Sequence, residues 1–418
     1  MALLPLCLAG ALLFHAQADP ARRLHADEAF FLSFARNAAV GGDWWLLGDL
    51  DKPPLTIYAN ALALALFAVT QDAQGVNQLN VYHGEFVGRL FGVWSALLAC
   101  ALVYALSLKL SSASWRGLGA LIAATLFAGS PYTLVLGASA FMDMPMLALG
   151  LAAVLAASHG RGAWAGVWLV LAFSAKPQGL LFAPVVLVGL WWAVPAVQRY
   201  QRLGRCGLAG ALGVVLLVLW DGVRAGESVF ALGAANNLSV SLNWYPRYAL
   251  PAVPFVLMAA GLGGAWLIVR WRERFWRRAS FGLVMVLALG WAARAPYDDA
   301  LNVAIESDWR RHDPIDVLAQ QVDALPLASV IYDQHLGWEM RYYLGQWTNK
   351  RRVHYGTCAR FAELAFSLPE RGTRYYLMPQ GARYETERED CFARLGKAWD
   401  KQLFSQVGHY RLYALTPP

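Results

Sequence analysis

Long uncharged stretches recur along the first two-thirds of the chain, and nine of them are long enough, or nearly so, to cross a bilayer. Several have only about 15 residues, so they need local thinning of the bilayer or flanking side chains that reach the interface. The pattern predicts a helical membrane bundle of about nine spans. The nine stretches are Ala2–Phe14, Leu90–Leu108, Gly117–Met142, Met144–Ser158, Gly162–Ala175, Pro177–Gln198, Cys206–Trp220, Tyr248–Val269 and Ala279–Ala293.

The first apolar stretch, Ala2–Phe14, has two interpretations. No basic segment precedes it, and the sequence Ala16-Gln17-Ala18 only weakly resembles a signal-peptidase site. We therefore expect an uncleaved first span, and a cleaved signal peptide is the alternative.

Two further segments near the start predict helices outside the spans. Asp27–Val40 carries Phe30, Phe34 and Ala38 along one helical face, and two glycines follow it. Residues 54–69 are apolar enough for a span, but the next connector holds no Lys or Arg. Counting them as a span would reverse the side of every later basic loop. We therefore predict a helix that lies in the outer face of the membrane.

Basic residues fall on alternate connectors, which sets the expected orientation. Lys and Arg gather in the cytoplasmic loops of membrane proteins. When the spans are numbered in order, every strongly basic connector falls on one side, which we assign to the cytoplasm. We expect a multi-pass protein of the inner (plasma) membrane whose other connectors and tail face the periplasm or outside. The basic connectors hold Lys109 and Arg116; His159 and Arg161; Arg199, Arg202 and Arg205; and residues 270–278.

Charge divides the chain into two parts. Of the 418 residues, 58% are hydrophobic and 15% are charged, whereas soluble domains average about 25% charged residues. Before Ala295 the chain has 12 acidic and 20 basic residues, and the remaining 124 residues have 16 and 15, so the net charge of +7 belongs to the first part. We predict a membrane domain over residues 1–294 and a soluble domain over residues 295–418. No basic arm with interleaved aromatic residues is present, so we expect no nucleic acid partner.

The tail predicts a small α/β domain. Residues 335–346 have the pattern of a helix, and we expect strands where β-branched and aromatic residues cluster, at 328–333, 351–356, 373–380 and 409–415. The fold class is therefore mainly α, a polytopic membrane helical bundle followed by a small C-terminal extracytoplasmic α/β domain.

The five cysteines fall into two groups. Cys7, Cys100 and Cys206 lie within or beside apolar spans, where we expect small buried side chains. Cys358 and Cys391 lie in the tail, and an extracytoplasmic compartment permits disulfides. We predict that these two are bonded to each other; two free cysteines in a small core are the alternative.

Charged residues from five separate segments are expected at the outer membrane face. Asp143 stands between two apolar runs with almost no loop around it, and an intramembrane carboxylate needs a partner or a function. Lys and Arg side chains there suit a phosphate, and a carboxylate suits removal of a proton from a hydroxyl. The residues expected at this face are Asp27, Glu28, Lys52, Asp143, Lys176 and Arg247.

Each of these residues also has a structural alternative. Glu28 is close enough to the start of a helix to support it through the helix dipole. Lys52 has Asp49 and Asp51 as neighbours for a surface ion pair of little worth. The cations that could simply anchor the end of a span at the interface are Arg89 and Arg247.

Several short motifs follow one another between residues 20 and 255. An Asp-Glu pair in ADEAFF follows the first stretch, then come GDWW and DKPPL, and an Arg opens the second span in EFVGRLFGVW. A lone Asp in ASAFMDMPM, a Lys in AFSAKPQGLL and the motif YPRYALPAVPF come later. In this order the motifs resemble the GT-C superfamily of membrane glycosyltransferases, and most of all the group of protein O-mannosyltransferases and lipid A aminoarabinose transferases.

The resemblance implies roles for individual residues. Asp27 corresponds to the general base, Glu28 is a further catalytic candidate of the same pair, and Asp143 would position the acceptor or the sugar. The family also has membrane-lying helices in its first outer loop, and many members carry an extracytoplasmic C-terminal domain. The residues expected to bind the substrate phosphate are Lys52, Arg89, Lys176, Arg247 and Tyr248.

The resemblance also implies the reaction. A sugar would move from a polyprenyl-phosphate donor to an acceptor hydroxyl by inverting displacement at the extracytoplasmic face. The acceptor could be a glycolipid, a polysaccharide or a protein, and membrane lipids would surround the enzyme. We expect no cofactor; a divalent metal is possible, but the sequence has no metal-ligand spacing that indicates one.

A non-enzymatic transporter or flippase of lipid-linked sugars is the alternative function. Transporters place polar groups near the middle of the membrane, often beside broken helices. Here the predicted spans have nearly uncharged centres and the charges gather at one face, which favours chemistry at that face over passage.

Overall fold

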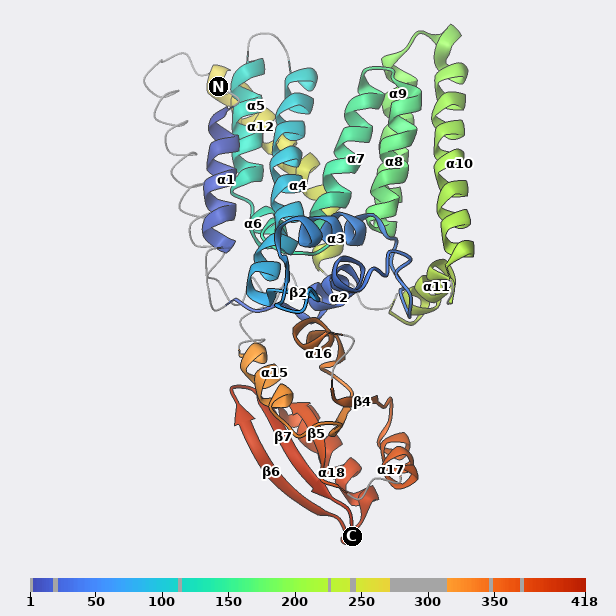
Figure 1. Cartoon of the computed structure of the whole chain (residues 1–418). Coiled ribbons are helices and arrows are strands. Elements are labelled where there is room, and N and C mark those ends of the chain that lie inside the picture. Colours follow the sequence, from blue (N-terminus) through green and yellow to red (C-terminus); the bar gives the residue numbers. More distant parts are fainter. Residues whose placement is uncertain are drawn as a thin grey trace. The chain divides into compact units, whose positions relative to one another are not determined.

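The computed structural model describes residues 3–17, 22–111, 115–224, 227–240, 246–270, 314–345, 349–368 and 372–418 (Figure 1). The chain divides into two compact units. Met1–Asp19 with Ala38–Ser307 form the first, here called the membrane unit, and Pro20–Asn37 with Asp308–Pro418 form the second, the C-terminal unit. The predicted boundary after residue 294 and the predicted span Ala279–Ala293 lie outside the described residues.

Most helices of the membrane unit form where the sequence is apolar. Eight of the nine predicted stretches are described, and each contains helix. The elements are α1 (Leu3–Gln17), α3 (Leu55–Phe67), α4 (Val81–Leu110), α5 (Arg116–Ala128), α6 (Pro131–Gly137), α7 (Asp143–Ser158), α8 (Gly162–Ala175), α9 (Ala183–Ala193), α10 (Arg199–Val223), α11 (Val229–Val240) and α12 (Val253–Arg270), with 3-10 turns at Pro177–Phe182, Ala196–Gln198 and Pro246–Ala252.

The lengths of these helices fit a multi-pass membrane protein. Among the described residues, three helices are long and apolar enough to cross a membrane by themselves, namely Val81–Leu110, Ala196–Val223 and Tyr248–Val269, and one bent pair would add a fourth. Five shorter apolar helices accompany them. Only 6% of the apolar window of Ala196–Val223 is buried. An exposed apolar surface of this size suits contact with lipid.

Two of the predicted spans are interrupted. The stretch Gly117–Met142 forms α5 and α6, which are bent by 54° at the break between them. Pro131 opens α6, and Ser130 before it is extended, because a residue that precedes proline avoids the helical region. The stretch Pro177–Gln198 likewise forms a 3-10 turn, then α9, then a second turn after Pro195. Neither break was predicted from the sequence.

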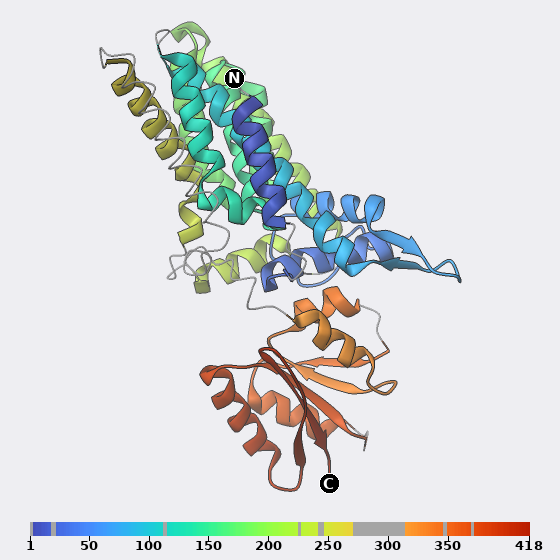
Figure 2. The same ribbon diagram turned by 90° about the vertical axis from the view of Figure 1, so that its left-hand side faces the viewer.

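Helix α3 forms within residues 54–69, as predicted, and packs against α4 and α8. A short antiparallel hairpin follows it, β1 (Val69–Gln71) and β2 (Asn77–Leu79), and extends away from the helices of this unit (Figure 2). Asp72 holds the turn of this hairpin, because its carboxylate accepts hydrogen bonds from the backbone of Gln74 and Val76. That α3 lies in a membrane face stays a prediction.

The C-terminal unit contains a five-stranded mixed sheet of order β4-β3-β5-β7-β6. Strands β3, β4 and β5 are parallel, whereas β7 is antiparallel to both β5 and β6. This confirms the small α/β domain. Its strands are β3 (Val330–Asp333), β4 (Arg351–His354), β5 (Arg374–Pro379), β6 (Asp400–Val407) and β7 (Tyr410–Thr416), and its helices are α15 (Ile315–Asp323), α16 (Gly337–Leu344), α17 (Cys358–Ser367) and α18 (Ala382–Leu395).

Helix α2 (Ala26–Gly41) forms where the Phe30, Phe34 and Ala38 pattern predicts it. Gly42 follows it with a φ of 73°, a backbone conformation that glycine adopts without strain. Most of α2 belongs to the C-terminal unit, whose first segment is Pro20–Asn37. The segment that carries Asp27 therefore packs with residues about 300 positions later in the chain.

The core of the C-terminal unit lies between the sheet and α17 and α18. Tyr332, Tyr376 and Phe361 are almost fully buried there. Cys358 and Cys391 join the two helices through a disulfide with a Cα–Cα distance of 4.6 Å, which confirms the predicted bond.

Of the remaining cysteines, Cys100 and Cys206 are buried as expected. The expectation for Cys7 was wrong, because Cys7 is exposed on α1. A helix in a bilayer can turn an apolar side chain toward lipid, so an apolar position in a span need not be buried in protein.

Candidate active site

Asp143 and Lys176 come together because α7 and α8 form an antiparallel pair. Asp143 is the first residue of α7, and Lys176 directly follows the last residue of α8. Gly160, with a φ of 67°, lies in the tight turn between the two helices. The start of α7 and the end of α8 therefore lie at the same end of the pair. The Lys176 Nζ donates to Asp143 Oδ1 at 2.7 Å.

This ion pair is almost enclosed by protein. The side chains of Lys176 and Asp143 are 12% and 5% exposed. The Lys176 Nζ also lies 5.6 Å from the centre of the Tyr248 ring, within the range of a cation–π contact. Three residues predicted for the site are thus brought together, one carboxylate, one ammonium and one phenol. A buried pair of this kind adds little to stability on balance, so its presence points to a function.

Lys52 lies in a loop of the membrane unit and donates to Asp51 Oδ2 at 2.7 Å. This is the ion pair that the structural alternative expects. The side chains are 28% and 16% exposed, so Lys52 keeps access to a ligand, and phosphate binding stays a prediction.

The loop that carries Lys52 is fixed by Arg224, which was not selected from the sequence. Its guanidinium donates to the backbone carbonyls of Leu46 at 2.7 Å and Gly48 at 2.8 Å. Asp221 lies 3.8 Å from Arg224 Nη1. In the sequence Arg224 is indistinguishable from a basic residue at the end of a span, so no signal marks this role.

Arg89 lies on α4 and is only 3% exposed. An arginine that anchors a span at the interface reaches outward with its guanidinium, whereas Arg89 is enclosed. Its binding role stays a prediction. Arg247 belongs to the 3-10 turn Pro246–Ala252, but its side chain lies outside the described residues.

Asp27 and Glu28 lie in the first turn of α2, within the C-terminal unit. Glu28 is fully buried, and its Oε2 accepts a hydrogen bond from the backbone N–H of His25 at 3.0 Å. The backbone N–H of Asp27 donates to His25 Nδ1 at 3.1 Å. Glu28 thus satisfies the start of the helix, as the structural alternative expects. Asp27 is half-buried. Catalytic roles for Asp27 and Glu28 stay predictions.

Two buried acids of the C-terminal unit were not selected from the sequence. Asp333 ends β3, and its Oδ1 accepts from the backbone N–H of Leu336 at 2.8 Å. Burial raises the pKa of Asp333, although this hydrogen bond opposes the rise. Burial is also the main reason that the pKa of Glu339 on α16 rises to about 8. The Asp333 and Asp27 carboxyl groups add to that rise, whereas His25 opposes it.

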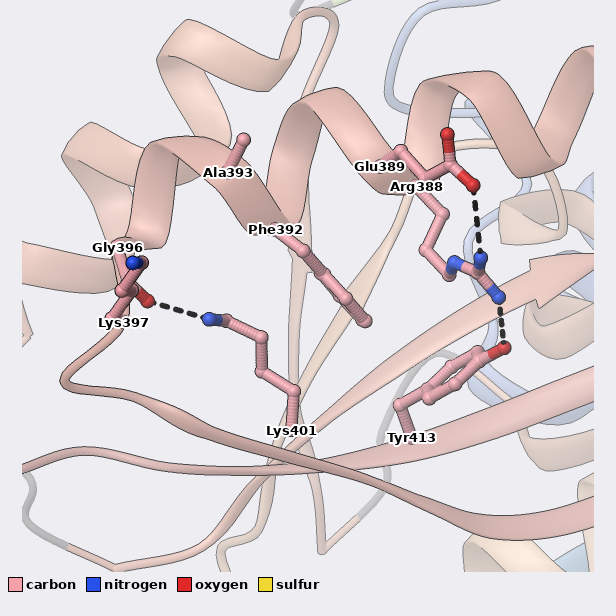
Figure 3. Close-up of a pocket in the computed structure, with 8 residues that line it drawn as sticks. All are labelled: Arg388, Glu389, Phe392, Ala393, Gly396, Lys397, Lys401 and Tyr413. Atoms are coloured by element: carbon pink, nitrogen blue, oxygen red, sulfur yellow. Dashed lines mark hydrogen bonds and ion pairs between the residues drawn. The ribbon is translucent and has the colours of Figure 1, made fainter.

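A cavity of about 620 Å³ lies on the C-terminal unit, beside α18 and β7 (Figure 3). None of the predicted site residues lines it. Two of its cations are already engaged, because Arg388 pairs with Glu385 at 2.7 Å and Lys401 donates to the Gly396 carbonyl at 2.5 Å. Tyr413 also accepts from Arg388 at 2.7 Å.

Within the described parts of the chain, no group of three or more His, Cys, Asp or Glu side chains is placed to hold a metal ion. The binding groups brought together in the membrane unit are instead an ammonium, a phenol and one carboxylate.

Comparisons with solved structures identify the fold. The chain is similar to ArnT from Cupriavidus metallidurans in its apo state, with a TM-score of 0.58, 14% identity and coverage of 99% of this chain and 97% of that chain. The structure of the same ArnT bound to undecaprenyl phosphate gives a TM-score of 0.58 at 12% identity. The oligosaccharyltransferase of Archaeoglobus fulgidus in its apo form gives 0.54 at 11% identity, over 96% of this chain and 73% of that one.

Comparisons of the sequence alone add nothing to these structural matches. No model of a known protein family matches it, and no curated protein matches it either. At 14% identity and below, a structural match establishes the fold and not the reaction. At the level of the fold, these matches agree with the sequence resemblance: this chain has the fold seen in ArnT and in the archaeal oligosaccharyltransferase.

Proposed function

We propose that the chain is a membrane glycosyltransferase that moves a sugar from a polyprenyl-phosphate donor to an acceptor hydroxyl. The observation that carries the proposal is the enclosed Asp143–Lys176 pair with Tyr248 beside it. Charged groups inside a membrane bundle are costly and are kept for binding or chemistry. One structural neighbour, ArnT, was solved with undecaprenyl phosphate bound, which supports a polyprenyl phosphate as the carrier lipid.

The proposed reaction is one inverting displacement. The acceptor oxygen forms a bond to the anomeric carbon while the bond from that carbon to the phosphate oxygen breaks. The electron pair of the broken bond leaves with the polyprenyl phosphate, and the acceptor proton goes to the Asp27 carboxylate. A phosphate is already a stable leaving group, so the protein must mainly orient the reactants and neutralise charge.

Each predicted residue takes a part in this reaction. Lys176 exchanges part of its interaction with Asp143 for the donor phosphate, and Asp143 is then available to hydrogen bond with a sugar or acceptor hydroxyl. Lys52, Arg89, Arg247 and Tyr248 bind the same phosphate. Glu28 supports the Asp27 segment and is the second catalytic candidate.

We also propose that the protein lies in the inner (plasma) membrane and that its C-terminal unit faces the periplasm or outside. The disulfide between Cys358 and Cys391 supports this, because such bonds persist in oxidising compartments. Reagents that alkylate or digest only outside-facing residues in intact cells test the orientation. Protection of the C-terminal unit in those cells would contradict it.

A lipid-sugar flippase is the second candidate, and one observation favours it. The 54° break between α5 and α6 is the kind of discontinuity that transporters place beside a substrate path. Incubation of membranes with a panel of labelled polyprenyl-phosphate sugars and with glycolipid, polysaccharide and protein acceptors separates the two functions. A transferase moves the label to an acceptor and releases the lipid phosphate, whereas a flippase changes only the side on which the intact donor lies.

A further inference from the structure

Glu339 lies on α16, in the same compact unit as the start of α2 that carries Asp27. Only 1% of its surface is exposed. A carboxyl group this deeply buried is kept neutral or is paired with a cation. Because the pKa of Glu339 is about 8, most of the molecules carry the proton at neutral pH.

Helix α16 is held against the Asp27 segment by side chains on both sides of Glu339. The Trp338 ring lies 4.5 Å from the Phe30 ring, edge to face. The backbone N–H of Leu24 donates to the Tyr343 hydroxyl at 3.3 Å. These contacts hold α16 against the chain on either side of Asp27, at Leu24 before it and at Phe30 after it. The Arg36 guanidinium on α2 also donates to the Tyr342 carbonyl on α16. Arg23, just before α2, pairs with Asp316 on α15 at 3.3 Å.

The ionisable groups around Glu339 come from several elements. His25 and Asp27 act on it from the start of α2, and Asp333 acts on it from the end of β3. Arg341 lies on α16 itself, 4.8 Å from the Trp338 ring. The groups that in turn act on Asp333 are Arg352, His354 and His335.

We propose that Glu339 is a positioning residue for Asp27, so that α16 of the C-terminal unit helps to hold the segment that carries the proposed base. The inference rests on the proposed function. As a neutral acid, Glu339 lets α16 pack closely against the start of α2 without a second negative charge beside Asp27. When Glu339 loses its proton, a buried charge faces the carboxylates of Asp27 and Asp333, and this repulsion opposes the packing that holds Asp27 in place.

The first test needs no activity. The pKa of Glu339 lies above the ordinary value of 4.5, so the folded state keeps a proton that the unfolded state releases. The stabilisation is complete below pH 4.5 and is lost as the pH rises toward 8. Wild-type Tm should therefore fall over this range. In full-length Glu339→Gln, whose amide is neutral at every pH, Tm should fall less between pH 5 and pH 8.

The second test measures transfer against pH. Wild-type kcat should decrease as the pH rises through about 8. Glu339→Gln should keep the pH 7 rate within about threefold, because an amide has the size and neutrality of the protonated acid, and its decrease at alkaline pH should be absent or moved up by at least about one unit. The donor KM should stay unchanged. Glu363→Gln is the matched control, since Glu363 lies on α17 with a side chain 65% exposed, and it should follow the wild type throughout.

The outcomes separate this inference from the proposed function. If the wild type transfers sugar and Glu339→Gln shows the same alkaline decrease, Glu339 does not position Asp27 and the inference alone is overturned. A variant that is slower by one constant factor at every pH would also overturn it, because that is the effect of a structural residue. If the Gln variant does not fold, the wild type decides, since a kcat that stays flat from pH 7 to pH 9.5 contradicts the inference. If the wild type transfers no sugar from any donor, both proposals fall.

Discussion

Asp143 in the membrane unit and Glu339 in the C-terminal unit are almost equally buried, with exposed fractions of 3% and 1%. The two units stabilise these carboxyl groups differently. Asp143 has the ammonium of Lys176 at 2.7 Å, whereas burial and the carboxyl groups of Asp333 and Asp27 favour the protonated form of Glu339. A paired carboxylate can exchange its partner for a ligand, and a neutral acid can change charge with pH. Asp143 therefore suits a role in ligand binding, whereas Glu339 suits a pH-sensitive positioning role.

Removal of one partner of the Asp143–Lys176 pair should have the largest effect on stability. Lys176→Met leaves a buried carboxylate without its cation, which should lower the free energy of unfolding by about 3–5 kcal/mol. The double variant Asp143→Leu with Lys176→Met should recover most of this loss, because it removes both charges. Chemical unfolding of the purified full-length protein measures both values.

The same two variants separate stability from activity. Sugar transfer should remain lost in the double variant even though its stability recovers. Recovery of transfer together with stability would show that the pair serves only the fold.

Loss of the disulfide tests how the C-terminal unit is stabilised. Cys358 and Cys391 are separated by 33 positions in the chain, and a loop of this length adds about 3–4 kcal/mol in the chain-entropy model. Cys358→Ser with Cys391→Ser should lower the free energy of unfolding of this unit by that amount. Cys100→Ser in the membrane unit should leave the C-terminal unit unchanged. An equal loss in the two proteins would contradict the prediction.

Donor binding should depend on cations of the membrane unit. Lys52→Ala and Arg247→Ala should each weaken donor binding by more than about tenfold, since a charge-assisted hydrogen bond contributes about 1.5–3 kcal/mol. Lys109→Ala, at the end of α4, provides a control from one of the basic connectors. Binding of a labelled donor to purified protein gives the dissociation constants. Unchanged affinity in both variants would mean that the phosphate binds elsewhere.

The smallest effect is expected for an exposed ion pair, and it calibrates the buried one. Arg394 and Asp390 form an i, i+4 pair on α18 at 3.1 Å, with side chains 48% and 53% exposed. Arg394→Ala should lower the free energy of unfolding by no more than about 0.5 kcal/mol. Thermal unfolding at low and high salt measures it. A loss near that of Lys176→Met would remove the contrast between exposed and buried pairs.

Hydrophobic pattern was sufficient to predict much of the fold, but not its breaks. Helices α4, α7 and α8 formed where the sequence is uncharged, and β3, β4, β5 and β7 formed at the predicted positions. Strand β6 was missed because its side chains are mostly exposed, so it lacks the alternation of buried and exposed residues that marks a strand. The bend at Pro131 was missed because hydropathy does not distinguish a broken apolar segment from a continuous one.

The candidate site was predictable only where short motifs carry it. Asp143 and Lys176 were selected because each is an isolated charge at the end of an apolar run, and the turn between α7 and α8 then brings them together. Glu339 was not selected because a single acid between Trp338 and Met340 in a predicted helix carries no local sign of burial. Its burial comes from contacts such as Phe30 with Trp338, which join residues far apart in the chain. A local sequence pattern does not show which distant residues will be in contact.

The central claim is that Asp27 removes the proton from the acceptor during sugar transfer. The most direct measurement compares the wild type with Asp27→Asn in membranes supplied with the labelled polyprenyl-phosphate donor that the panel identifies. Asn keeps the shape of Asp but accepts no proton, so the account predicts equal amounts of folded protein and a transfer rate lower by about 10²–10⁴. An Asn variant that keeps most of the wild-type rate would contradict the assignment of Asp27 as the base.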